Sequence, residues 1–125
     1  MRHVVAMELA IAPRTGATYM RPHKNGWGSS MSRLDEDGLR VKGTTLPDLL
    51  NSTATDSVSL VKMDVEGAET LLLPHVGPFC AERKIPLLIE VHQPMWRHAP
   101  FDPACLSGFS NIEGEMKDFG HVLCT

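Results

Sequence analysis

Residues 58–69, with the sequence VSLVKMDVEGAE, contain the strongest structural signal in the chain. The segment from Val58 to Val65 is rich in valine and other apolar residues, which predicts a strand that is buried on both faces, as parallel strands are. Gly67 ends this strand, and apolar residues at helical spacing follow it, which predicts a helix. Strand and helix in direct succession are typical of an α/β protein.

A second buried strand is predicted at Leu87–His92, directly after Pro86. Pro74 and the pair Gly77-Pro78 interrupt the helical pattern between the two strands, so one short helix and a second turn near Arg83 are expected there. The segment therefore predicts a β-α-β unit, in which the two strands run parallel as neighbours.

The rest of the chain gives weaker signals. Alternating or apolar residues predict further strands, and Thr45 is a suitable N-cap for a short helix with Pro47 in its first turn. Gly26-Trp27-Gly28 is interpreted as loop, because no apolar strand precedes it. In chain order we expect strands at Val4–Ile11, 17–21 and 39–44, a loop over 22–38, the helix from Thr45 to Leu50, a weak helix near 111–118 and a strand at His121–Cys124.

Composition bounds the class of protein. The chain has 125 residues, of which 42% are hydrophobic and 22% charged, with a net charge of −3. These values are typical of one globular domain without a basic patch for nucleic acid, and no apolar run is long enough to span a membrane. Three widely spaced cysteines and no apparent leader peptide favour a cytoplasmic protein without disulfides.

Polar residues gather at the ends of the two predicted parallel strands. Because side chains alternate along a strand, Lys62 and Asp64 share one face of the first strand, and Glu90 and His92 share one face of the second. Glu66 follows the first strand. If the strands pair, Asp64, Glu66, Glu90 and His92 converge at the carboxyl ends, where open α/β sheets bind ligands.

A simpler interpretation of these residues is that they are solvent-facing groups at strand exits, with Lys62 extended along the sheet. Glu69 is interpreted as a charge at a helix start rather than a catalytic group. Trp27 and Trp96 are expected to pack in the core or a loop.

Leu60-Val61-Lys62-Met63-Asp64-Val65-Glu66-Gly67-Ala68-Glu69 resembles the signature of the FkbM methyltransferase family. Thr44–Leu50 and Pro86–His92 resemble the segments that flank this signature in the family. Ala10–Pro13 with Gly16 resembles an earlier strand and turn. The likeness covers residues 3–92 well and 93–125 loosely, so residues 1–125 are expected to form a single partial methyltransferase domain.

The resemblance implies a class I methyltransferase-like, Rossmann-like three-layer α/β sandwich. Val4–Ile11, Val58–Val65 and Leu87–His92 would then be its third, fourth and fifth strands. The first two strands, with the Gly-rich turn against the cofactor, have no counterpart in this chain, so the domain is expected to be incomplete. The edge of Val58–Val65 would be unpaired, which favours self-association or pairing with another chain.

The resemblance also implies S-adenosylmethionine as cofactor and O-methylation of a hydroxyl on a small molecule or glycan. The hydroxyl would attack the methyl group in line while a general base takes its proton. His92 is the expected base, with Asp64 and Glu66 as further catalytic and cofactor-binding residues. Glu90 and Lys62 are the expected substrate-binding residues, with Glu90 contacting the substrate or orienting His92.

Two other functions remain open at this point. The chain can be a non-catalytic fragment or an interaction module that pairs through its exposed sheet edge. It can also be a metal-dependent hydrolase with Asp64, Glu66 and His92 as ligands. No established spacing of metal ligands occurs in the sequence, so a metal site is not the favoured interpretation.

Overall fold

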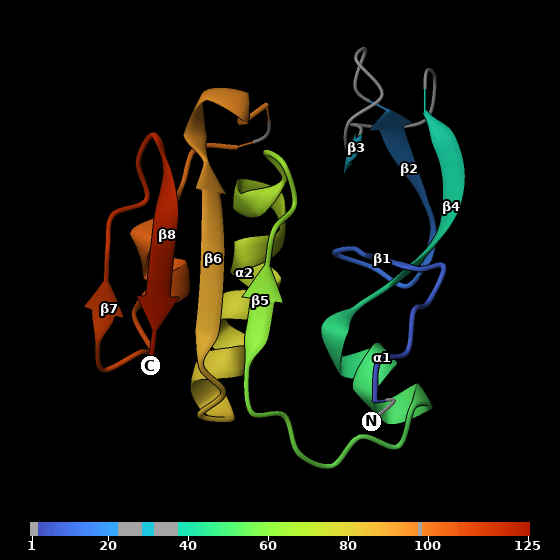
Figure 1. The fold of residues 1–125 in the computed structure, drawn as a ribbon, viewed down its shortest axis with the longest axis horizontal. Coiled ribbons are helices and arrows are strands. Elements are labelled where there is room, and N and C mark those ends of the chain that lie inside the picture. Colours follow the sequence, from blue (N-terminus) through green and yellow to red (C-terminus); the bar gives the residue numbers. More distant parts are fainter. Residues whose placement is uncertain (1–2, 23–28, 32–37, 98) are drawn as a thin grey trace.

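The computed structural model describes residues 3–22, 29–31, 38–97 and 99–125. This part of the chain forms two four-stranded sheets, side by side in Figure 1, and two α-helices. The predicted mixed α/β class is therefore confirmed. The Gly26-Trp27-Gly28 segment lies outside the described residues, as does most of the loop predicted over 22–38.

The first sheet has the order β1-β4-β2-β3. Its strands are β1 (Ala10–Ile11), β2 (Gly16–Pro22), β3 (Ser29–Met31) and β4 (Leu39–Thr44). The strands predicted at 17–21 and 39–44 are confirmed as β2 and β4, and β3 is a short strand inside the predicted loop. The strand predicted over Val4–Ile11 is limited to Ala10–Ile11, which alone pair with β4. Without a ladder partner among the described residues, Val4 is 94% exposed.

Helix α1 (Leu46–Ser52) starts where the sequence predicts. The Thr45 side chain accepts a hydrogen bond from the Asp48 backbone N–H at 3.2 Å, which satisfies one of the free donors of the first turn. Pro47 fits the first turn because its missing N–H would have no partner there.

The second sheet has the order β5-β6-β8-β7. Its strands are β5 (Val61–Met63), β6 (Leu87–His92), β7 (Ile112–Glu113) and β8 (Phe119–Cys124). The predicted parallel pair is confirmed, with Met63 opposite Ile89, although β5 is shorter than Val58–Val65. The helix predicted near 111–118 is wrong. β7 and β8 form an antiparallel pair there, and Gly114 turns the chain at φ +102°.

Helix α2 (Glu69–Glu82) connects β5 to β6 without a break, so the predicted interruption at Pro74 and Pro78 is wrong. The helix continues because its apolar face is buried in the core, and this burial outweighs the hydrogen bonds that proline cannot make. The buried apolar side chains of this face are Leu72, Leu73, Val76 and Cys80.

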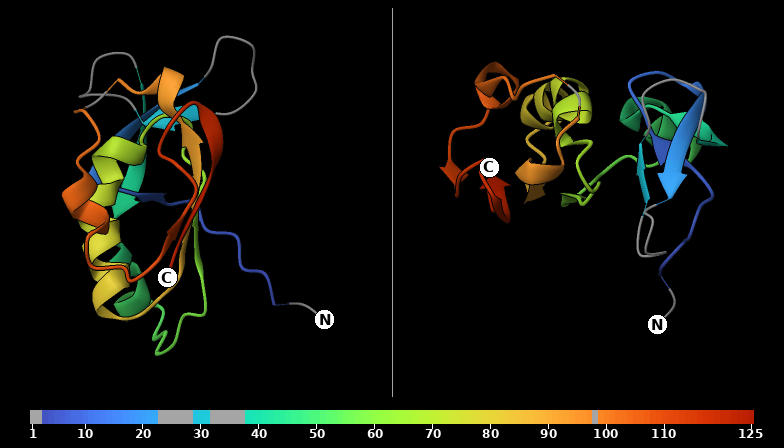
Figure 2. Two further views of the ribbon diagram at one scale, coloured as in Figure 1. Left: turned by 90° about the vertical axis from the view of Figure 1, so that its left-hand side faces the viewer. Right: turned by 90° about the horizontal axis from the view of Figure 1, so that it is seen from above.

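Only one face of the second sheet is covered by helices in the described part of the chain. Seen from above in Figure 2, α2 and the short helix η2 (Pro103–Leu106) lie on the same side of β6 and β8. Met63 is buried, but Lys62 and Asp64 are exposed. The prediction that Val58–Val65 is buried on both faces is therefore wrong, and the open face is where the polar residues lie.

The core is one cluster of buried apolar side chains. It extends from Ala12 and Leu46 beside the first sheet to Leu87, Ile89 and Val122 in the second. Among the described residues, no helix has the length and apolar character that crossing a membrane requires.

Candidate functional site

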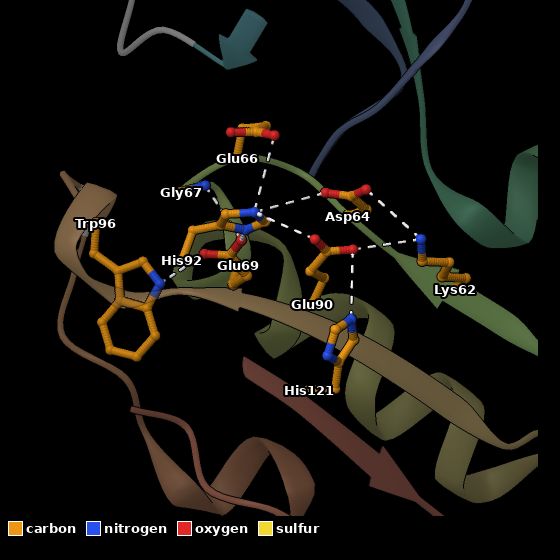
Figure 3. Close-up of polar contacts among 9 residues, drawn as sticks. All are labelled: Lys62, Asp64, Glu66, Gly67, Glu69, Glu90, His92, Trp96 and His121. Carbon is orange, nitrogen blue, oxygen red and sulfur yellow. Dashed lines mark hydrogen bonds and ion pairs between the residues drawn. The ribbon is translucent and has the colours of Figure 1, made fainter. Parts of the chain in front are cut away.

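The polar residues predicted from the sequence come together where β5 and β6 end (Figure 3). His92 Nε2 lies 3.8 Å from Asp64 Oδ1. It lies 3.9 Å from Glu66 Oε1 and 3.9 Å from Glu90 Oε1. The predicted convergence of these four residues is confirmed, and it follows from the parallel register, which places the ends of both strands at one edge.

A tight turn after β5 brings Glu66 back toward His92. Glu66 has φ +50° and Gly67 has φ +102°, a region that disfavours most side chains. A Cβ atom at position 67 would overlap the carbonyl oxygen of Met95, in the 3₁₀ helix η1 (Gln93–Met95). Glycine is therefore required here for the chain to pass η1 and enter α2.

Glu69 is fully buried and its carboxylate accepts three hydrogen bonds. The donors are the Gly67 backbone N–H at 3.2 Å, His92 Nδ1 at 2.8 Å and Trp96 Nε1 at 2.6 Å. A buried carboxylate is costly unless it is hydrogen-bonded, and here both oxygens have donors. Glu69 is thus the residue that fixes the orientation of the His92 ring.

His92 is 7% exposed, and its two ring nitrogens have different surroundings. Because Gly67 N–H and Trp96 Nε1 can only donate, Glu69 acts as acceptor, and Nδ1 holds the proton of the neutral ring. Nε2 then has a free lone pair facing the acidic side chains. Burial alone lowers the pKa of His92, but the Glu69 hydrogen bond and the charges of Glu69, Glu66 and Asp64 raise it above its ordinary value.

Lys62 joins the site from the other side of Glu90. Its Nζ lies 3.7 Å from Asp64 Oδ2 and 3.4 Å from Glu90 Oε2, and His121 Nε2 lies 3.7 Å from the same Glu90 oxygen. Desolvation raises the pKa of Glu90, whereas Lys62, His121 and His92 lower it, and the net direction is downward. Glu90 is therefore paired with cations, and Glu69 rather than Glu90 orients His92.

A cleft of about 840 Å³ opens beside the end of β5. Asp64, Val65 and Leu72 line one side, and residues of the first sheet, among them Ile11 and Val41, line the other. Asp64 thus stands both in the wall of the cleft and beside His92, whereas Glu66 is not a lining residue. The volume lies in the range of clefts that hold small molecules and cofactors.

The sequence interpretation missed Glu69, Trp96 and His121 as part of the site. Glu69 does begin α2, as expected, but its main contacts are His92 and Trp96. One signal could have identified it: position 69 shares helical spacing with Leu72, Leu73 and Val76, so it lies on the apolar face of α2. A carboxylate on that face must have buried partners. No comparable signal exists for Trp96 or His121.

Comparison with known proteins identifies the family. A model of the FkbM methyltransferase domain matches residues 4–123, which is nearly the whole chain. No curated protein sequence and no solved structure matches the chain. The motif of β5 and its following turn, from Leu60 to Glu69, thus lies inside the family match and supplies most of the site. The chain belongs to the FkbM methyltransferase domain family.

Proposed function

We propose that the chain is a methyltransferase that transfers the methyl group of S-adenosylmethionine to a hydroxyl group. Family membership supports methyl transfer in general. The observation that favours a hydroxyl acceptor is the buried Glu69–His92 pair, whose geometry leaves a ring nitrogen free to accept a proton. A hydroxyl must lose its proton during methylation, and a histidine is the usual group for this task.

In this proposal His92 Nε2 takes the proton of the acceptor hydroxyl. The positive charge that the ring gains is stabilised by Glu69 at Nδ1 and by Asp64 and Glu66 at 3.8 and 3.9 Å from Nε2. Because Glu69 is buried and hydrogen-bonded, the ring cannot turn away from the acceptor, which keeps the proton transfer in line.

The residues at the cleft fit the proposed cofactor. S-adenosylmethionine would supply an activated methyl group on a positively charged sulfonium. The carboxylate of Asp64 in the cleft wall suits that positive charge, and Glu66 adds a second carboxylate beside His92 Nε2. The apolar walls of the cleft, such as Ile11 and Val65, suit an adenosine group. We further propose that the two sheets are parts of a Rossmann-like sandwich. We also propose that the protein is cytoplasmic, which the three buried free cysteines support.

Glu90 and Lys62 are the proposed acceptor-binding residues. Both lie on the open face of the second sheet next to His92, and both are partly exposed. A carboxylate and an ammonium side by side can hydrogen-bond neighbouring hydroxyl groups as acceptor and donor, respectively. This pairing is compatible with a small polyhydroxylated molecule or a glycan as acceptor.

The direct test is transfer of a radiolabelled methyl group from S-adenosylmethionine to a panel of hydroxyl-bearing small molecules and glycans. The variant His92→Asn retains a donor for Glu69 but cannot accept a proton, so the rate should fall by ~10²–10⁴-fold. The matched control His75→Asn changes an exposed histidine on α2 and should leave the rate unchanged. An unchanged rate in His92→Asn would remove His92 from the proposed role.

A second candidate function is supported by the position of β5. Within the described residues β5 pairs with β6 alone and forms one edge of its sheet, and Leu60 beside it is 49% exposed. Such an edge suits pairing with another chain. Calorimetry separates the two candidates: saturable binding of S-adenosylmethionine supports the transferase, and its absence favours an interaction module.

A further inference from the structure

Three side chains of the site are arranged like ligands of a metal ion. One nitrogen or oxygen atom from each of Asp64, Glu66 and His92 lies within 4.8 Å of the other two. Two of these distances, from His92 Nε2 to Asp64 Oδ1 and to Glu66 Oε1, are 3.8 and 3.9 Å. Two ligands of a tetrahedral Zn²⁺ ion lie ~3.4 Å apart. A small movement of the two carboxylates, which are at the surface, would therefore complete a binding geometry.

The ring nitrogen that faces this cluster has no hydrogen-bond partner among the described residues. His92 is more than nine-tenths buried, yet its Nε2 has only carboxylate oxygens near it, all at 3.8 Å or more. The side chain is held almost entirely inside the protein, and the one ring nitrogen without a hydrogen bond faces three carboxylates, which is a suitable arrangement for binding a cation. The neutral ring, with a lone pair on Nε2, is the form of histidine that binds metal ions.

The contact behind the ring supports the same assignment. Metal-binding histidines usually donate their other N–H to a carboxylate, which fixes the tautomer and strengthens the ligand. Glu69 Oε1, fully buried, stands in this position at 2.8 Å from His92 Nδ1. Because Glu69 is also hydrogen-bonded by Gly67 and Trp96, the ring is held with Nε2 toward Asp64 and Glu66.

The distribution of charge leaves a place for a cation. Four carboxylates meet here, from Asp64, Glu66, Glu69 and Glu90, and Lys62 pairs with two of them. Lys62 lies nearest to Asp64 Oδ2 and Glu90 Oε2, whereas Asp64 Oδ1 and Glu66 Oε1 are the oxygens that face His92 Nε2. Carboxylates this close repel each other, and a cation bound between them would offset that repulsion.

We propose that Asp64, Glu66 and His92 form a binding site for a divalent transition-metal ion, with Glu69 as the outer partner of His92. One imidazole and two carboxylates suit Zn²⁺ and Mn²⁺ better than Mg²⁺, which prefers oxygen ligands alone. Affinity is expected to decrease from Zn²⁺ to Mn²⁺ to Mg²⁺. The site does not depend on the proposed methyl transfer, because it follows from geometry and charge.

A cation bound at this site would also regulate the proposed reaction. Nε2 has one lone pair, so a bound cation prevents it from accepting a proton. The cation is therefore expected to inhibit the proposed methyl transfer, and a chelator is expected to restore it. This part rests on the proposed function, whereas binding itself can be measured without any methyl transfer.

The test is calorimetric titration of the metal-free 125-residue chain with Zn²⁺, and then with Mn²⁺ and Mg²⁺. The expected result is one Zn²⁺ per chain, with affinity reduced about 10-fold or more in Asp64→Asn and in Glu66→Gln. Both side chains are at the surface, so these variants should fold, and thermal melting checks this. The control Glu115→Gln removes an exposed carboxylate elsewhere and should bind like wild type.

Two results would overturn the proposal. The first is the absence of saturable binding of Zn²⁺ by the folded chain. The second is binding that Asp64→Asn and Glu66→Gln leave unchanged, or that Glu115→Gln weakens equally, because the ion would then be held elsewhere. A third outcome separates the two proposals. If wild type binds Zn²⁺, the Asp64 and Glu66 variants lose this binding and no methyl transfer is detected, the result counts against the proposed function alone.

Discussion

At residue 69, a carboxylate with no exposed surface accepts hydrogen bonds from a backbone amide, an imidazole and an indole. Replacement by alanine would leave all three donors without a partner in a buried environment. Each unsatisfied buried donor costs about 1–3 kcal/mol. Because water entering the space left by the side chain would satisfy some of the three donors, we expect Glu69→Ala to destabilise the fold by about 3 kcal/mol in total. Urea denaturation measures this difference.

The control is Glu115→Ala, an exposed glutamate whose change should stay within about 0.5 kcal/mol. Equal stability of Glu69→Ala and wild type would mean that the Glu69 network is not formed in solution.

At the same scale, the sequence predicts part of the site well. Asp64, Glu66, Glu90 and His92 were expected to converge because the alternation of side chains and the pairing of parallel strands fix their faces. The contact between Glu69 and His92 depends on how α2 packs against β6, and on the turn at Gly67. Helical spacing places Glu69 on the apolar face of α2 but does not identify the side chains that it contacts there, so the sequence predicts only its local role at a helix start.

Among the elements, α2 is packed against η2 at Gly77. A Cβ atom at this position would overlap the carbonyl oxygen of Cys105, which is backbone and cannot move aside as a side chain could. We therefore expect Gly77→Ala to destabilise the fold by about 1–2 kcal/mol, because the overlap outweighs the better helix propensity of alanine. The change is read from the midpoint of urea unfolding.

Gly120→Ala in β8 is the matched control, since an added Cβ there has no atom within 4 Å. It should change stability by no more than about 0.5 kcal/mol. If Gly77→Ala were as stable as this control, the close approach of α2 and η2 would be wrong.

The elements also show where sequence patterns are sufficient. β6 and α1 were predicted nearly to the residue, because a buried apolar run and an N-cap are strong local signals. Residues 111–118 and the prolines of α2 were misjudged for a different reason. Propensity is weak there, and the outcome depends on pairing with β8 or on burial against the sheet.

For the whole molecule, the reactivity of the three buried cysteines indicates whether the core is closed to solvent. Burial raises the pKa of Cys80 to about 11 and that of Cys124 to about 11, and it also raises the pKa of Cys105. A thiol with a raised pKa is less ionised, so at pH 8 only about 0.1% of Cys80 would be the reactive thiolate. We expect the folded chain to react slowly with a thiol reagent at pH 8.

In denaturant all three thiols should react quickly. With a thiol reagent that releases a coloured product, absorbance measures the reaction rate of the folded chain and that of the unfolded chain. Rapid reaction of the folded chain would contradict the buried positions of the cysteines.

The edge formed by β5 leads to a prediction about association. If the exposed edge pairs with a second chain, the protein should self-associate as its concentration rises, and Leu60→Lys should reduce this by placing a charge beside the edge. Light scattering coupled to size-exclusion chromatography measures the mass. Leu39→Lys changes a leucine that is 65% exposed on β4 and should behave like wild type. Equal association of Leu60→Lys and Leu39→Lys would exclude pairing at this edge.

Proton transfer and metal binding both depend on the state of one imidazole ring, that of His92, at the junction of β5, α2 and β6. Two-bond ¹H–¹⁵N correlation spectra of the histidine side chains, recorded at a pH where the rings are neutral, show which ring nitrogen holds the proton. The His92 signals are assigned by their loss in His92→Asn. We predict a proton on Nδ1, bound to Glu69, and a bare Nε2. A proton on Nε2 would contradict both the proposed proton transfer and the proposed metal site.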